Sequence, residues 1–440
     1  MIRKLIFNKI INNTFLIYIL FLISLGFSTY IYCTEIVKLY PNLIDEKKNY
    51  NITGIGFFFN EIIESILIGN KPVNTINDID FFTLRMPALP YFLAYTYLYI
   101  TKNFLLIHLF KNFLFGSILF FIAKSFDKKL NNLFLIILLI LIFYNPHNLI
   151  TSLSTNFEEG WSNYLIPTTF ILLCSNIKNK SILLSISLSF LFFLKASLFY
   201  LSFGLALIYF FIEKKKNYLP ILTIIICSLS WGMKSYVNTG KFAFGPKNTS
   251  LNGLTTGLVF HKKFQETYPM YTPDMHWDLV WEEIKKNKKN ISNEWDASNL
   301  ILEKSLKYIY ENPIDILLGV YKKIYILTLS PFKDTLIYDE NIKNPENKIR
   351  YSNIPNKIIF LISIIFLFKS FINLKSKNLN LKTLNVYYFF ILVFYLFPYI
   401  SVFIYGRHCT TLYILSYIYL IFYFLFAEKN NKIKKILIKN

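Results

Sequence analysis

The chain has 440 residues, of which 54% are hydrophobic and 19% aromatic, and its mean hydropathy is +0.41. A soluble globular domain needs a more polar surface than this composition provides, so we interpret the chain as an integral membrane protein with several crossings. The formal net charge of +21 comes mainly from lysines that cluster in short runs between apolar segments. That pattern is typical of the positive-inside bias of membrane proteins and argues against nucleic-acid binding.

Twelve apolar segments follow one another, near residues 15–33, 87–100, 104–123, 132–145, 163–176, 181–194, 197–212, 219–235, 314–330, 357–372, 386–404 and 410–427. Several are shorter than the roughly 20 residues that a straight membrane-spanning helix needs. If all of them crossed in alternation, the lysine clusters at 124–129 and 214–216 would both lie outside, against the positive-inside bias. We therefore expect 87–100 and 104–123 to make one crossing together, and 314–330 to lie at the membrane surface.

These segments predict an all-α polytopic membrane protein with about ten to twelve transmembrane or re-entrant helices. We divide the chain into three regions on the basis of its polar stretches. Residues 1–235 are a membrane domain whose first extracytoplasmic loop, 34–86, contains amphipathic helices. Residues 236–313 form a small extracytoplasmic lobe, and 314–440 are C-terminal membrane helices with a basic cytoplasmic tail.

The stretch "DIDFFTLRMPALPYFLA" at 78–94 places charged residues and two prolines at the start of an apolar segment. Arg85 stands two residues before Pro87, so the chain is held extended at Met86 and a helix can begin at the proline. A guanidinium held in this way presents a fork of donors that suits phosphate. Arg85 is therefore a candidate phosphate ligand, and an arginine that contacts lipid headgroups is the alternative.

The segment "RMPALPYFLA" resembles the R-x-P-x-x-P-x-F-L-A signature of many family C glycosyltransferases, including relatives of bacterial protein O-mannosyltransferases and lipid A aminoarabinose transferase. Other stretches resemble parts of the same family in the same order along the chain. "EIIESILIGNKP" resembles the amphipathic helix of its first outer loop, and "FLFFLKASLFYLSFG" resembles two short helices interrupted by a basic residue. "YGRHCTTLYILSYIYLI" resembles the final long helix with its opening arginine.

The resemblance implies a glycosyltransferase that moves a sugar from a polyprenyl-phosphate donor to a hydroxyl of a lipid-linked glycan, a lipid or a protein. It also implies a multi-pass protein of the bacterial inner membrane, with the active site at the extracytoplasmic face. Membrane lipids and the donor are the expected partners, and nucleic acid is not. No cofactor is assigned, and a divalent cation is left open.

The donor phosphate becomes the leaving group in such a reaction, so cations must hold it and stabilise its developing charge. Lys195 interrupts the apolar stretch 181–212, which divides into two short helices around it, and Arg407 opens the last helix. In the predicted topology Arg85, Lys195 and Arg407 reach the same membrane face from separate parts of the chain. We assign all three to donor-phosphate binding. A lysine that extends toward lipid headgroups is the alternative for Lys195, and a charged helix end is the alternative for Arg407.

The acceptor hydroxyl needs a general base, which family members usually supply as an aspartate of the first outer loop. The corresponding position falls near Ile55, where this chain has no acid. The acids that could take this role are Glu61 or Glu64 on the amphipathic helix, Asp45 or Glu46 upstream, and Asp78 or Asp80 close to Arg85. We rank Glu61 and Asp80 first as the catalytic carboxylate. A chain that is not catalytically competent in the usual way is the alternative.

Three further acids are candidates for positioning the substrate or a cation. Asp78 lies close to Arg85, and Glu158 and Glu159 lie in an outer stretch without lysines. Carboxylates and phosphate oxygens are ligands that hard divalent cations prefer, so a metal bound with the phosphate is one interpretation. Solvated acids at a helix start are the alternative for Glu158 and Glu159.

Other polar residues have more local interpretations. Asn293 is expected to cap a helix that ends before Pro313. His108 and Lys111, within an apolar segment, are expected to pack or to form hydrogen bonds between helices. The tryptophans and tyrosines of the lobe are expected either to stack on sugar rings or to form the core of the lobe; they are Trp277, Trp281, Trp295, Tyr268 and Tyr271.

Two other functions fit a polytopic chain with a large outer loop. An O-antigen polymerase or ligase would also carry arginine and histidine in outer loops, but it gives no reason for the early proline-arginine signature. A non-enzymatic flippase or transporter for lipid carriers would have charged residues near the bilayer midplane and internal pseudo-repeats, and we find neither pattern.

Overall fold

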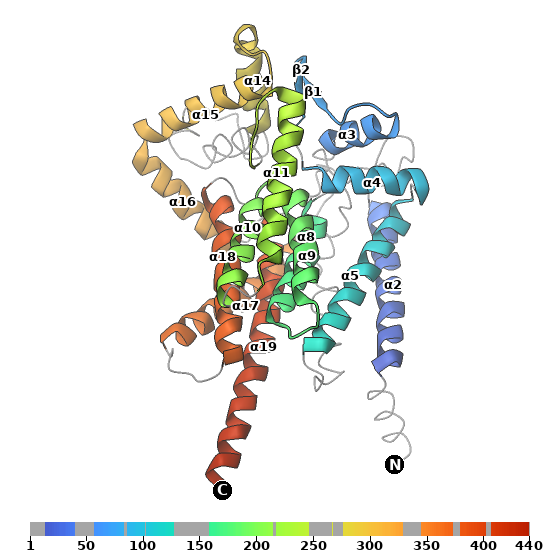
Figure 1. The fold of residues 1–440 in the computed structure, drawn as a ribbon, viewed down its shortest axis with the longest axis vertical. Coiled ribbons are helices and arrows are strands. Elements are labelled where there is room, and N and C mark those ends of the chain that lie inside the picture. The colour runs from blue at the N-terminus through green and yellow to red at the C-terminus, as the bar shows by residue number, and fades with distance from the viewer. Residues whose placement is uncertain are drawn as a thin grey trace.

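The computed structural model describes residues 14–39, 57–82, 86–101, 103–126, 158–213, 217–245, 266, 276–328, 345–372, 379–401 and 406–439. Most of these residues are helical, and the helices form an elongated bundle with a smaller group of elements at one end (Figure 1). α2 begins and α19 ends at the opposite end of the bundle. The predicted apolar segment at 132–145 lies outside the described residues.

Six of the described helices contain a stretch that is long and apolar enough to cross a bilayer. Each such stretch has at most two charged residues, and in five of the six most of the residues are not buried within the bundle, the exception being the stretch in α19. The chain is therefore an integral membrane protein of the all-α polytopic class, as its composition predicted. The helices are α2 (Thr14–Leu39), α5 (Phe104–Phe126), α11 (Leu219–Thr239), α17 (Pro345–Ile372), α18 (Leu379–Ser401) and α19 (Gly406–Lys439).

The centre of the bundle is α8 (Glu158–Cys174), which is buried along almost its whole length. It packs against α5, α18 and α19, and also against α9 (Lys180–Leu194). A helix with apolar or small residues on every side, as in "GWSNYLIPTTFILLC", is suited to a site that is enclosed by other helices. Its first turn carries two acidic residues, Glu158 and Glu159.

The apolar stretch 181–212 is broken at Lys195, as the sequence predicted. α9 ends at Leu194, Lys195 has extended backbone angles of φ −150° and ψ 140°, and α10 (Leu198–Ile212) follows. The two short helices pack against each other. The break places the Lys195 side chain at the end of the bundle instead of in the middle of a long helix.

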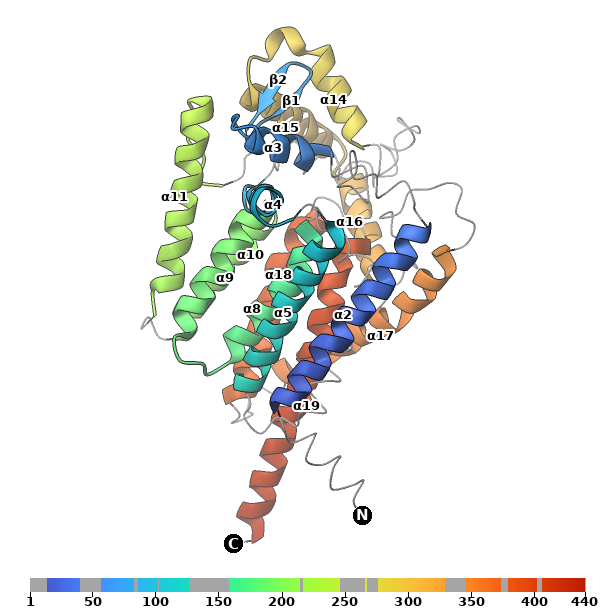
Figure 2. The ribbon, with the colours of Figure 1, turned by 90° about the vertical axis from the view of Figure 1, so that its right-hand side faces the viewer.

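α4 (Ala88–Tyr99) lies across the end of the bundle, roughly perpendicular to α5, and is seen end-on in Figure 2. It has only 12 residues, whereas α5 contains an 18-residue candidate membrane span. α4 begins directly after Pro87, because proline is well tolerated at a helix start. Of the two predicted segments 87–100 and 104–123, only the second therefore contains a candidate span; the single crossing stays a prediction.

The lobe combines two distant parts of the chain. A hairpin of β1 (Asn74–Ile76) and β2 (Ile79–Phe81) turns through Asn77 and Asp78, both at positive φ, which these two residue types tolerate. Ile79 and Phe81 pack on Val280 and Ile284 of α14 (His276–Lys286) and on residues of the next helix, α15 (Glu294–Glu311). We call the hairpin, α14 and α15 the lobe. Its core therefore includes a part of the predicted first outer loop.

The tryptophans whose side chains the structure describes in the lobe serve its packing. Trp281 makes an edge-on contact with Phe81, with ring centroids 5.7 Å apart. Trp295 is 9% exposed and donates a hydrogen bond from Nε1 to Thr239 Oγ1 at 2.9 Å. These contacts favour the core interpretation over sugar stacking. The side chains of Trp277, Tyr268 and Tyr271 lie outside the described residues.

The prediction that Asn293 caps a helix that ends before Pro313 is confirmed. Asn293 Oδ1 accepts hydrogen bonds from the backbone N–H of Trp295 at 2.8 Å and of Asp296 at 3.2 Å. α15 ends at Glu311, and α16 (Pro313–Thr328) begins at the proline. The cap satisfies N–H groups that have no partner within the helix.

We expect the Asn293→Ala substitution to destabilise the lobe by about 1 kcal/mol, because two backbone donors lose their acceptor. The measurement is denaturant unfolding followed by tryptophan fluorescence, to which Trp281 and Trp295 contribute. Asn290→Ala is a suitable control, since Asn290 is exposed and lies before the helix. An equal loss of stability in both variants would contradict the assigned capping role.

Candidate functional site

Lys195 and two acids of α8 form a charged cluster at the lobe end of the bundle. Lys195 Nζ makes an ion pair with Glu159 Oε1 and lies 3.9 Å from Glu158 Oε2. It also lies 5.4 Å from the centroid of the Tyr399 ring, on α18. We call Glu158, Glu159 and Lys195 the acid-lysine cluster. The structure thus brings together three residues that the sequence analysis assigned to two different roles.

The acid-lysine cluster is enclosed by protein. Glu158 is 5% exposed and Glu159 is 2% exposed. A carboxylate that is withdrawn from water costs several kcal/mol unless a cation or hydrogen-bond donors compensate it. Lys195 supplies that cation, and the first turn of α8 adds the favourable positive end of the helix dipole. The solvated alternative for the two acids is therefore wrong.

Neighbouring helices continue the polar environment around the cluster. The Tyr399 hydroxyl is 3.1 Å from Ser197 Oγ, which lies two residues after Lys195. One turn after Glu159, Asn163 Oδ1 accepts a hydrogen bond from Thr411 Oγ1 of α19 at 2.5 Å. Arg407 lies one turn before Thr411, in the first turn of α19. Its backbone is therefore at the same end of the bundle as the cluster, and its side chain lies outside the described residues.

The pairing of Lys195 changes what the site can do chemically. Two carboxylates face one ammonium, so an incoming phosphate would have to compete with Glu158 and Glu159 for Lys195. Lys195 alone is then a weak phosphate site. The geometry favours a role for the two acids in holding the lysine at the end of the bundle.

Glu61 lies on α3 (Phe57–Leu67), which packs on α4. Its side chain is half-buried, and Oε2 accepts a hydrogen bond from Asn74 Nδ2 at 2.8 Å. Asn74 is itself buried, so this contact orients one carboxylate oxygen. Glu64, three residues later, is exposed. The two glutamates therefore differ in environment although they are one helical turn apart.

Asp78 and Asp80 lie on the hairpin of the lobe, away from the end of the bundle in both views (Figures 1 and 2). Asp80 is exposed, and its Oδ1 accepts a hydrogen bond from Thr75 Oγ1 at 2.7 Å. Asp78 forms an ion pair with Lys288, which lowers the pKa of the Asp78 carboxyl. The structure does not bring these two acids to the acid-lysine cluster, and their contacts are within the lobe.

Arg85 lies outside the described residues, but the residues that follow it border an apolar groove. The groove has a volume of about 720 Å³ and runs along α9, between the start of α4 and the start of α11. Ala88, Ser185 and Ser189 leave room in its wall because their side chains are small. The serine hydroxyls bond to carbonyl groups of their own helix, which removes most of their polar character.

A second buried polar group connects α5 with its neighbours. His108, Lys111 and Asn112 are fully buried, and Asn112 Nδ2 donates to Thr29 Oγ1 of α2 at 3.0 Å. Lys111 Nζ lies 5.7 Å from the centroid of the Trp161 ring on α8. His108 and Lys111 are thus buried in the packing of the bundle, as expected, and Asn112, which the sequence analysis did not select, adds a hydrogen bond between helices.

Among the residues that the structure describes, no group of three or more His, Cys, Asp or Glu side chains could hold a metal ion. Glu158 and Glu159 both contact Lys195. Comparison of the chain with models of protein families found no match, and comparisons with curated proteins and with solved structures found none either.

Proposed function

We propose that this chain is a membrane glycosyltransferase that transfers a sugar from a polyprenyl-phosphate donor to a hydroxyl acceptor. The observation that carries this proposal is the acid-lysine cluster, enclosed at the end of the bundle beside the lobe. We place this end on the extracytoplasmic side. The lysine-rich end of α19 and the turn with Lys178 and Lys180 lie at the opposite end, which fits the positive-inside bias.

The donor phosphate is bound by three cations in this proposal. Glu158 and Glu159 hold Lys195 at the end of the bundle. The Lys195 ammonium also contacts the donor phosphate in this proposal. Because two acids already share this lysine, the charge that develops on the leaving phosphate needs additional cations. Arg85 and Arg407 supply them, and their guanidinium groups suit phosphate oxygens.

Glu61 is the general base in this proposal. Asn74 holds Glu61 Oε2, which leaves Oε1 to accept the proton of the acceptor hydroxyl. The hydroxyl oxygen then forms the new bond to the anomeric carbon, while the bond to the phosphate oxygen breaks and its electrons leave with the phosphate. α3 packs on α4, and α4 packs on α9, which leads to Lys195. These contacts support Glu61 over Asp80.

The apolar groove holds the hydrocarbon tail of the donor in this proposal. It is lined almost entirely by apolar atoms, and it is open at the surface of the protein. One end lies at Pro87, two residues after Arg85, so a lipid phosphate near Arg85 could extend its tail along α9. An extended chain of apolar units fits such a groove better than a compact ligand does.

The test of this function is transfer of radiolabelled sugar from a panel of polyprenyl-phosphate sugars, in membranes that contain the protein. The Arg85→Ala and Arg407→Ala variants are compared with the unchanged chain after equal insertion has been verified. We expect transfer from at least one donor and its loss in both variants, because each removes a cation that holds the phosphate. Transfer from no donor, or transfer that neither change affects, would contradict the proposal and favour a polymerase or a flippase.

Filling the groove is expected to weaken donor binding. The Ser189→Phe substitution should raise the KM for a long-chain donor roughly tenfold, which corresponds to about 1.4 kcal/mol. A donor with a shortened tail should be affected less, because it occupies less of the groove. Steady-state kinetics with both donors provide the measurement, and Ser230→Phe, on the exposed face of α11, is the control. Equal effects on both donors would argue against a tail site.

A further inference from the structure

The junction of α15 and α16 has an exposed apolar surface that neither the bundle nor the lobe covers. Tyr310 is 89% exposed, Ile314 73%, Leu317 70% and Tyr321 68%. Ile314, Leu317 and Tyr321 follow the i, i+3, i+7 spacing of one helix face. Tyr310 continues this surface across the break before Pro313. We call residues 306–324 the elbow.

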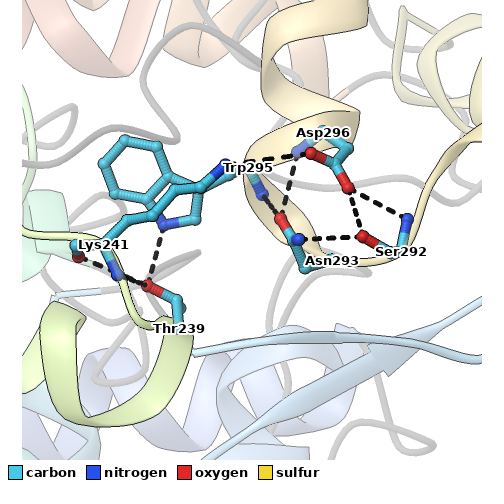
Figure 3. Close-up of polar contacts among 6 residues, drawn as sticks. All are labelled: Thr239, Lys241, Ser292, Asn293, Trp295 and Asp296. Carbon is cyan, nitrogen blue, oxygen red and sulfur yellow. Dashed lines mark hydrogen bonds and ion pairs between the residues drawn. The ribbon is translucent and has the colours of Figure 1, made fainter.

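The start of α15 is fixed at the end of a candidate membrane span. Trp295 Nε1 donates to Thr239 Oγ1 at 2.9 Å, and Lys241 Nζ lies 3.9 Å from Asp296 Oδ1 (Figure 3). Thr239 is the last residue of α11, whose span is Leu219–Thr239. The start of α15 is therefore attached to the end of α11, at the level of the lobe (Figures 1 and 2).

From the end of α11, α15 runs outward, and α16 turns back down toward the bundle (Figure 1). α16 packs on α17, α18 and α19, each of which contains a candidate membrane span. The exposed apolar face of the elbow is therefore continuous with the surface that the spans present to lipid. It is not an isolated patch on the lobe.

The chemistry of the elbow matches the boundary between headgroups and acyl chains. Tyr310 and Tyr321 combine an apolar ring with a hydroxyl, as residues at membrane interfaces commonly do. Lys307 and Lys322 are exposed beside the apolar residues and can reach anionic headgroups. A protein partner would not require this combination of basic and amphipathic side chains along a surface that continues into the lipid-facing bundle.

We propose that the elbow inserts into the lipid leaflet on the lobe side of the membrane and anchors the lobe to it. The lobe then has two attachments to the membrane domain, one at Trp295 and Thr239 and the other through the elbow. This inference concerns lipid contact alone and does not rest on the proposed enzymatic activity.

The experiment uses the full chain with a photoreactive benzophenone amino acid at Leu317 or at Tyr310, in vesicles of phosphatidylcholine and phosphatidylglycerol. Both positions are exposed, so the larger side chain does not disturb the core. The control position is Lys289, exposed in the turn between α14 and α15 at the part of the lobe farthest from the bundle. After illumination, mass spectrometry identifies the adducts.

We expect phospholipid adducts when the benzophenone is at Leu317 or Tyr310, and no phospholipid adducts when it is at Lys289. Absence of lipid adducts at the elbow would overturn the proposal, and so would equal labelling at Lys289. Adducts with a second copy of the chain in place of lipid would overturn it as well, because they would show that protein covers the elbow.

Discussion

Replacing Lys195 with methionine is expected to destabilise the protein by about 3–5 kcal/mol, because it removes a cation that contacts two enclosed carboxylates. Glu158 and Glu159 are almost completely buried, and Lys195 contacts both of them. Methionine has a similar length, so the main loss is the charge and not the packing. The measurement is thermal or denaturant unfolding in detergent or nanodiscs.

The chain contains a matched control for this result. Lys180 pairs with Glu213 at 3.5 Å, but the Glu213 side chain is 37% exposed. Lys180→Met should therefore cost less than about 1 kcal/mol, since water can solvate the remaining carboxylate. Adding Glu159→Gln to Lys195→Met should recover part of the lost stability. If the two single lysine variants lost the same stability, burial of the acid-lysine cluster could not be the reason.

Replacing Glu61 with glutamine is expected to lower sugar transfer between about 100-fold and 10,000-fold, the usual contribution of a general base. Glutamine keeps the shape of the side chain, and its amide oxygen can still accept the hydrogen bond from Asn74 Nδ2. The unfolding midpoint should therefore change little. The measurement is the rate of transfer at saturating donor, together with the unfolding midpoint of each variant.

Glu64→Gln is the control, because Glu64 is on the same helix and is exposed. It should transfer sugar at the rate of the unchanged chain. A normal rate of sugar transfer in Glu61→Gln would exclude Glu61 as the base. Asp80 would then be the next candidate, and Asp80→Asn the next variant to measure. A loss of stability in Glu61→Gln that matches its loss of activity would indicate a structural role instead.

Several local features could be predicted from the sequence because their causes lie within a few residues. Apolar length and lysine position predicted the membrane class. A charged residue within an apolar stretch predicted the break at Lys195, and Asn293 before an apolar periodic run predicted the cap of α15. The hairpin turn at Asn77 and Asp78 also has a recognisable sequence, because apolar and polar residues alternate on either side of it. The sequence analysis did not predict this hairpin.

The tertiary structure decided which of these residues meet. Lys195 and Glu159 are 36 positions apart, and their contact depends on how α8 and α9 are rotated against each other. The hairpin at 74–81 joins α14 and α15 across about 200 residues, since Asn77 bonds to the Trp281 carbonyl with a separation of 204. Composition and periodicity define each helix and its apolar side. They do not define which helices pack against each other, because that choice depends on burial summed over the whole bundle. For the same reason, only the tertiary structure shows that Asp78 and Asp80 lie in the lobe and not at the acid-lysine cluster.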